Sequence, residues 1–141
     1  MRNSLLVLAS FVAAVAAQGV KIVAPAVNTT LTLGETFVID VERPDSLTGS
    51  QEVAIVIGIQ SCGQSCDNIN TAGDIGRPLY SGLYTPTIVG NGRADLAQNF
   101  TVQLPDNIQT GAAVLAVAHF ALIIGTEPFL EVVNQVVEIQ P

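Results

Sequence analysis

Apolar and polar residues alternate along much of this 141-residue chain, with the period of two that an extended strand requires. The two clearest examples are residues 35–43 and 98–105. The residues expected to face inward are Phe37, Ile39, Val41, Phe100, Val102 and Leu104. Those expected to face outward are Thr36, Asp40, Glu42, Asn99, Thr101 and Gln103. Since turn residues separate such stretches and no long helical pattern follows the N-terminus, the sequence predicts an all-β protein.

Two further stretches are apolar on both faces. Residues 51–60 and 112–124 therefore indicate central strands that are covered on each side. The alanines of 112–124 leave a short buried helix as an alternative, but its β-branched residues and the turn before it favour a strand. The first strand is expected to be broken at Pro25, as is common at a sheet edge. In the last strand the apolar phase changes between Phe129 and Ile139, which predicts a bulge.

About seven short strands in one small domain predict a two-sheet sandwich of immunoglobulin or fibronectin type III character. The chain contains no Trp and lacks the inter-sheet disulfide of antibody domains, so the expected likeness is to the architecture alone. No repeat or second domain is apparent.

The first 17 residues have the composition of a secretory signal peptide, with a positive charge at Arg2 followed by an apolar stretch at 5–16. We expect cleavage between Ala17 and Gln18, which leaves residues 18–141 as a single domain. A membrane anchor is the alternative, but the apolar stretch is shorter than the roughly 20 residues that span a bilayer. The sequence therefore predicts a secreted, extracellular protein without stable membrane insertion.

Acidic residues outnumber basic ones by twelve to five, and the formal net charge is −7. The phosphate backbone of a nucleic acid would be repelled by such a chain. Nucleic acid is therefore not an expected partner.

Cys62 and Cys66 are the only cysteines of the chain, and secreted cysteines usually pair. Two cysteines and one histidine cannot supply four zinc ligands, and a redox centre would normally show two residues between its cysteines rather than three. Four extended residues would separate the Cα atoms by about 13 Å, whereas a disulfide needs roughly 4.4 to 6.8 Å. The segment must therefore fold back, which Gly63 facilitates, and we expect a local structural disulfide rather than a functional thiol.

Two sequons, at Asn28 and Asn99, fit the acceptor pattern for N-glycosylation. Each asparagine must face solvent to carry a glycan. The outward position that the strand pattern gives to Asn99 agrees with this requirement.

The candidates for chemistry are few, and no catalytic constellation emerges from them. His119 lies within an apolar run, where a single histidine is more often a packed, hydrogen-bonded residue than a base or ligand. The carboxylate pairs Asp40 with Glu42 and Glu127 with Glu131 could in principle serve glycoside hydrolysis, although most such charges are solvated strand faces. We therefore expect a protein that is not an enzyme and that holds no cofactor or metal.

Tyr80 and Tyr84 are candidates for a small binding patch, although tyrosines near strand ends are commonly structural. Such a patch would suit a second interpretation, a non-catalytic module that binds cell-wall material or carbohydrate. A sugar-binding surface would be marked by exposed aromatic side chains, and these two tyrosines are the ones that qualify.

Four segments together resemble the necrosis-inducing secreted protein family of plant-associated fungi: SLTGSQEVAIVIGIQSC, NFTV, AVAHFALI and PFLEVVNQVVEI. They cover most of the mature chain in matching order and spacing, whereas residues 67–78 and 87–95 have no counterpart. The resemblance implies a secreted fungal effector that provokes plant cell death and suppresses pattern-triggered immunity. It further implies binding to host receptor-like kinases and their cytoplasmic kinase partners, and hence passage into the host cytoplasm. It supplies no catalytic residues.

Binding to a kinase would then depend on the surface of the protein and not on an active site. A rigid sandwich can present an edge strand to a partner, because edge strands carry unpaired backbone groups. By their position in the chain, the first and last strands are the candidates.

Overall fold

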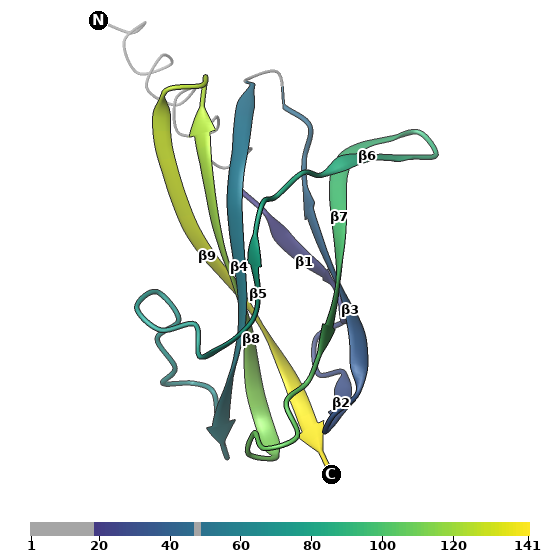
Figure 1. Cartoon of the computed structure of the whole chain (residues 1–141), viewed down its shortest axis with the longest axis vertical. Helices are drawn as coiled ribbons and strands as arrows, with labels where there is room; N and C mark the ends of the chain where they lie inside the picture. The colour runs from purple at the N-terminus through teal and green to yellow at the C-terminus, as the bar shows by residue number, and fades with distance from the viewer. Residues whose placement is uncertain (1–18, 47–48) are drawn as a thin grey trace, which may run out of the picture.

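The computed structural model describes residues 19–46 and 49–141, which form two facing β-sheets without a helix (Figure 1). The predicted signal peptide at 1–17 and its cleavage site between Ala17 and Gln18 lie outside the described residues. The strands are β1 (Lys21–Ala24), β2 (Thr30–Thr32), β3 (Thr36–Arg43), β4 (Ser50–Gly63), β5 (Arg77–Gly82), β6 (Thr87–Gly90), β7 (Arg93–Gln103), β8 (Gly111–Ile123) and β9 (Glu127–Gln140). The all-β prediction and its two-sheet arrangement are therefore confirmed.

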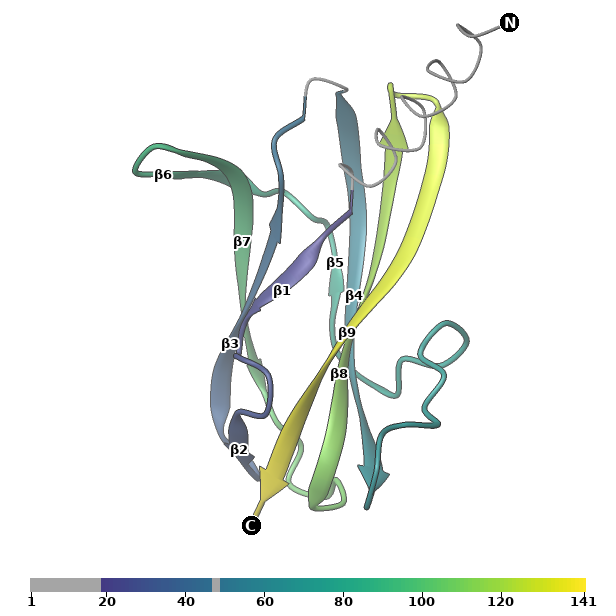
Figure 2. The same ribbon diagram turned by 180° about the vertical axis from the view of Figure 1, so that it is seen from behind.

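The two sheets differ in size. One sheet, here called sheet A, has the order β1-β3-β7-β6, and the other, sheet B, has the order β2-β9-β8-β4-β5. In the reverse view of Figure 2 the chain crosses from sheet A to sheet B between β1 and β2. This crossing follows Pro25, so the predicted broken strand is in fact two strands in different sheets.

The described residues contain nine strands where about seven were expected, partly because residues 19–34, expected to form one broken strand, give rise to two. Residues 79–89, where the sequence indicates one or two short strands, contribute to β5 and β6. The immunoglobulin or fibronectin type III character stays a prediction. Residues 112–124 lie within or next to β8, a strand between β4 and β9, so the helical alternative is wrong.

Two details of the last strand differ from the sequence-based expectation. β9 pairs with β8 in continuous register from Glu127 to Ile139, so the predicted bulge is wrong. The apolar phase changes because polar Glu131 and Gln135 face inward and apolar residues take outward positions. The last strand is covered at its C-terminal end, where β2 pairs with Glu138, Ile139 and Gln140, and the rest of that side of β9 has no strand partner among the described residues. β1, in contrast, is an edge strand as predicted.

The core forms where the inward faces of the two sheets meet. Phe100 and Val102 of β7 are buried as predicted, while Asn99 and Thr101 are exposed. The buried apolar residues of the core cluster are Val20, Leu31, Ile39, Val41, Ile55, Ile57, Ile59, Tyr84, Phe100, Val102, Leu104, Ala113, Leu115, Val117, Val137 and Ile139. Burying each large side chain contributes about 1.5–3 kcal/mol, so this shared interior is the main force that holds the sheets together.

Cys62 and Cys66 form the predicted disulfide, with Cα atoms 4.9 Å apart. Gly63 has a φ of 70°, a left-handed conformation that glycine adopts without strain and that lets the ring turn back. The two cysteines close the start of the loop that joins β4 to β5.

This loop, residues 64–76, lies against the outer face of sheet B (Figure 1). The amide of Asn134 on β9 donates a hydrogen bond to the hydroxyl of Thr71, which is itself buried. Gly58 of β4 lies directly beneath the carbonyl of Ile75, where any Cβ would collide with that backbone. The loop therefore explains why β4 and β8 are apolar on both faces: one face packs in the core, and the loop covers part of the other.

Mild reduction of Cys62–Cys66 should leave both sheets folded and lower the free energy of unfolding by about 2 kcal/mol, because closing so small a ring restricts the unfolded chain only modestly. Hydrogen exchange should become faster in residues 62–76 and stay unchanged in β3 and β7. Denaturant unfolding of the oxidised and reduced forms measures the first effect. Global unfolding on reduction would contradict the local role of the disulfide.

Candidate functional site

Four charged side chains meet inside one end of the sandwich, and we call them the charged chain: Glu131 of β9, His119 of β8, Glu52 of β4 and Arg43 of β3. His119 is fully buried, with Nδ1 3.0 Å from Glu131 Oε1 and Nε2 2.5 Å from Glu52 Oε2. Arg43 Nε lies 3.1 Å from Glu52 Oε1, at ion-pair distance. Because Arg43 belongs to sheet A and the other three to sheet B, the charged chain joins the two sheets.

Strand geometry explains why these residues meet. His119 and Glu131 are cross-strand partners in the register of β8 and β9. In β4 the pairing with β8 shifts between Glu52 and Ala54, so one additional residue rotates the end of the strand. This bulge turns the Glu52 side chain inward, where regular alternation from Ile55 would have placed it outward.

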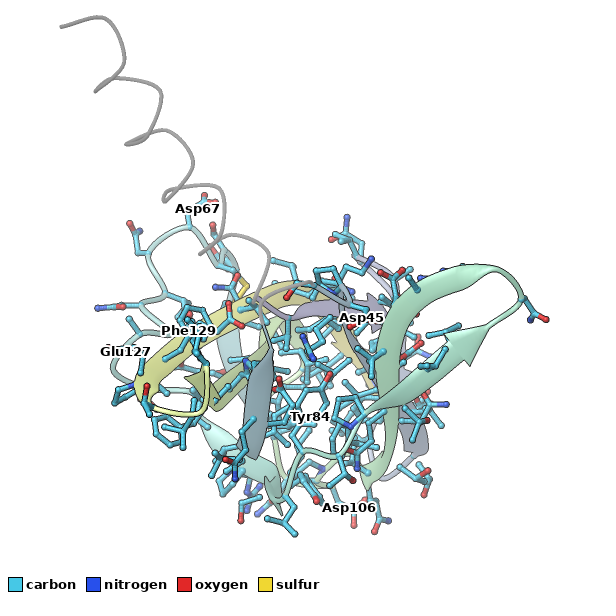
Figure 3. The ribbon with its side chains drawn as sticks, turned by 90° about the horizontal axis from the view of Figure 1, so that it is seen from above. Asp45, Asp67, Tyr84, Asp106, Glu127 and Phe129 are labelled. Carbon is cyan, nitrogen blue, oxygen red and sulfur yellow. A yellow bond between two sulfur atoms is a disulfide. The ribbon has the colours of Figure 1, made fainter. Side chains whose placement is uncertain are left out.

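Neutral groups complete the site. The Ser50 hydroxyl donates to Glu52 Oε1 at 2.6 Å, and the backbone N–H of Val20 donates to Glu131 Oε1 at 2.7 Å. The His119 ring is flanked by the rings of Tyr84 and Phe129, with centroids 5.4 and 6.3 Å away. Figure 3 looks down on this end of the molecule, with Tyr84 near the centre of the view and Phe129 to one side.

Both pKa shifts in the charged chain favour the ionised forms. Burial by itself lowers the pKa of His119, but hydrogen bonds and charges from Glu131 and Glu52 outweigh it and raise that pKa above the usual 6.5. Burial likewise favours a higher pKa for Glu52, yet hydrogen bonds from His119 and Ser50 and the charges of His119 and Arg43 bring it below the usual 4.5. Below the raised pKa of His119 the imidazole is protonated and can donate from both ring nitrogens.

This arrangement suits a structural role better than catalysis. Both ring nitrogens of His119 are engaged by carboxylates, so neither is free to act as a base or to bind a metal. Within residues 19–46 and 49–141, no group of three or more potential ligand side chains is placed to hold a metal ion. The prediction that His119 is a packed, hydrogen-bonded residue is confirmed.

The two tyrosines that were candidates for a binding patch differ in their burial. Tyr84 is 1% exposed, and its hydroxyl donates to the carbonyl of Val41 at 3.0 Å, so its assignment to a binding patch is wrong. Tyr80 is half-buried and packs on Phe100, with ring centroids 4.7 Å apart. Burial of Tyr84 leaves little of the aromatic surface that a carbohydrate-binding module would need.

The proposed carboxylate pairs are not simple solvated faces. Glu131 belongs to the charged chain, whereas Glu127 is exposed. Glu42 faces outward from β3 as predicted but is only 2% exposed, because Arg93 lies 2.6 Å and Lys21 3.5 Å from its Oε2. Burial and repulsion from Glu42 raise the pKa of Asp40, against the opposing charges of Arg93 and Lys21.

Asp40 and Glu42 line a hollow of about 440 Å³ on the outer face of sheet A, here called the outer groove. Its other lining residues are Thr85, Thr87, Ile88, Val89, Ala97, Gln98 and Asn99. Asn28 and Asn99 are both exposed, as the sequons require, and Asn99 lies within this groove. Glycosylation of either residue stays a prediction.

The charged chain has a definite pH dependence. Because the folded pKa of His119 is raised, its contribution to stability is complete below about 6.5 and is lost as the pH rises through the folded pKa. Because the folded pKa of Glu52 is lowered, its contribution is complete above about 4.5 and is lost as the pH falls through the folded pKa. Stability should therefore be greatest in the mildly acidic range between these limits.

The variant His119→Gln should lose the alkaline limb of this profile and unfold more easily at pH 5.5, by about 3–5 kcal/mol. The reason is that Glu131 loses its cationic partner in the charged chain, while Glu52 keeps only Arg43. Denaturant unfolding of wild type and variant between pH 4 and 9 measures both effects. Both proteins share the same exposed carboxylates, so subtracting one curve of unfolding free energy against pH from the other removes their contribution. Parallel curves across the whole range would contradict the assignment.

Comparisons with solved structures show the fold alone. A superoxide reductase (neelaredoxin) from Ignicoccus hospitalis is 13% identical, with a TM-score of 0.50 over 87% of this chain and 81% of that chain. A β-glucosidase from Listeria innocua is 15% identical, with a TM-score of 0.38 over 86% of this chain and only 16% of that chain. The first likeness supports the sandwich arrangement, and the second is too low to support an argument.

No curated protein matches the sequence significantly. No helix in the described part of the chain could span a membrane. The Nis1 family model, in contrast, matches residues 15–138. This family comprises secreted fungal effectors defined by the induction of necrosis, in agreement with the resemblance of the four sequence segments. The match spans nearly the whole chain, so the chain belongs to the Nis1 family.

Proposed function

We propose that this protein is a secreted effector that induces plant cell death and suppresses pattern-triggered immunity by binding host receptor-like kinases and their cytoplasmic kinase partners. The observation that carries the proposal is the family match over residues 15–138. Binding to the cytoplasmic partners requires that part of the protein enters host cells.

The proposed action is occupancy rather than catalysis. His119 is the single histidine, and the charged chain engages both of its ring nitrogens. Both cysteines form a disulfide, so neither supplies a thiol nucleophile. These features support a protein that acts by covering the functional surface of a partner.

The binding surface proposed for this action is the edge of sheet A. β1 and β6 are the two edge strands of this sheet. Ile88 of β6 is 67% exposed and Val23 of β1 is 42% exposed, so each edge carries an apolar side chain in solvent. In Figure 2 the hairpin of β6 and β7 projects from the body of the sandwich, which leaves its edge accessible to a partner. A net charge of −7 would favour approach to a basic surface.

Charged substitutions at the sheet A edges, Ile88→Lys and Val23→Lys, should each weaken kinase binding by about tenfold, because a lysine on an edge strand opposes pairing with another strand. Leu130→Lys is the matched control, since Leu130 is equally apolar and 71% exposed but lies on sheet B. Titration of purified kinase ectodomains and kinase domains against each variant gives the affinities. Equal binding by all three variants would eliminate the edge surface, and no binding by the wild type would eliminate the kinase partner.

Expression of the chain in plant leaves should cause cell death and reduce the immune oxidative burst. Versions with and without residues 1–17 should differ in potency, because only the first is directed to the secretory pathway. Both proteins are quantified in the tissue by immunoblot. With both present at matched levels, the absence of cell death and of burst suppression would reject the effector function.

A further inference from the structure

The outer groove is built from three strands of sheet A. Asp40 and Glu42 of β3, Asn99 and Ala97 of β7, and Thr87 of β6 all line it. Its volume, about 440 Å³, lies in the range of sites that hold small organic ligands. One wall is anchored to β7, because the N–H of Thr85 donates to Gln98 Oε1 at 2.7 Å.

Asn99 lines this groove and is also the glycan-acceptor residue of the sequon Asn99-Phe100-Thr101. All three residues of the sequon belong to β7, so the strand determines which way each side chain points. Asn99 pairs in register with Asp40 and is exposed on the outer face. Phe100, the central residue of the sequon, is 4% exposed and anchors β7 in the core. Thr101 is exposed on the same face as Asn99. A sugar joined to the Asn99 amide would therefore start inside the groove.

We propose that the first sugars of an N-linked glycan on Asn99 occupy the outer groove. The polar lining matches this occupant, since the Asp40 carboxylate can accept hydrogen bonds from sugar hydroxyls and acetamido N–H groups, and threonine hydroxyls both donate and accept. The exposed side chain of Ile88 offers an apolar surface to the face of a sugar ring. Attachment to Asn99 holds the glycan near the groove at an effective concentration in the millimolar range, so individually weak contacts suffice.

The occupied groove has a structural consequence. Among the described strands β6 pairs with β7 alone, so the projecting hairpin should open more easily than the body of the sandwich. A glycan in contact with β3, β7 and β6 would hold this hairpin against the outer face of sheet A. Asn28 provides the contrast, because it lies between β1 and β2 and does not line the groove.

The experiment uses the full chain secreted from a eukaryotic host, as wild type, Asn99→Gln, Thr101→Val and Asn28→Gln. Intact mass before and after treatment with peptide N-glycosidase reports which sequon carries a glycan. Thr101→Val removes the sequon but keeps Asn99, so it separates loss of the glycan from loss of the asparagine side chain. Hydrogen exchange is then followed in residues 85–90, a segment that contains no glycosylation site.

We expect a glycan on Asn99 and exchange in residues 85–90 that is about threefold or more slower in the wild type than in Asn99→Gln and Thr101→Val. Enzymatic removal of the glycan from folded wild type should accelerate exchange to the same extent, whereas Asn28→Gln should not. An unoccupied Asn99, or equal exchange with and without its glycan, would overturn the proposal.

A second arm separates the attached glycan from a free carbohydrate. Asn99→Gln is titrated with N,N′-diacetylchitobiose while amide shifts of the groove residues are recorded. Saturable binding of this sugar at micromolar concentration would identify the groove as a site for an external carbohydrate and overturn the proposal. The inference depends on passage through the secretory pathway and not on kinase binding, so either proposal can fail without the other.

Discussion

Burial of the apolar core holds the two sheets together, and at one end of the sandwich it requires that the charges buried there neutralise one another. Arg43 comes from sheet A, and it meets Glu52, His119 and Glu131 of sheet B in an interior that excludes most water. A single ion left there without a partner would cost several kcal/mol. The positive charge of protonated His119 neutralises the second carboxylate, so the stability of this end of the fold depends on pH. The backbone N–H of Val20 donates to Glu131, which also contacts His119. This hydrogen bond connects the N-terminal segment of the domain to the charged chain.

The outer faces of the two sheets are covered to different extents. On sheet B, the loop at 64–76 begins at the disulfide and packs over β4, where Gly58 permits its close approach. On sheet A, no comparable loop covers the described strands β3, β7 and β6, and the outer groove lies there instead. Sheet A thus offers the outer groove and the edge strands β1 and β6 as surfaces for partners or for a glycan.

A sandwich of this kind suits an effector that acts through its surface. The single imidazole is engaged by two carboxylates of sheet B, and both thiols form a disulfide. Variation in function would then depend on edges, loops and attached sugars, which can change without disturbing the core.

The sequence by itself determined the features that depend on neighbours along the chain. Alternation at 98–105 predicted the faces of β7 correctly, and a pair of cysteines in a chain with a predicted secretion signal predicted the disulfide. The family, too, was recognisable from four segments of sequence. The solitary position of His119 indicated burial but gave no indication of its partners.

Only the tertiary structure decided which distant residues meet. Glu52 lies 67 positions from His119 in the sequence, and a bulge that no residue pattern predicted turns it inward. Tyr84 was one of two tyrosines considered for a binding patch, yet it is buried and its hydroxyl reaches a backbone carbonyl 43 positions away. The outer groove likewise depends on the alignment of β3, β7 and β6. Periodicity reports which face of a strand is buried, whereas strand order and register decide what it is buried against.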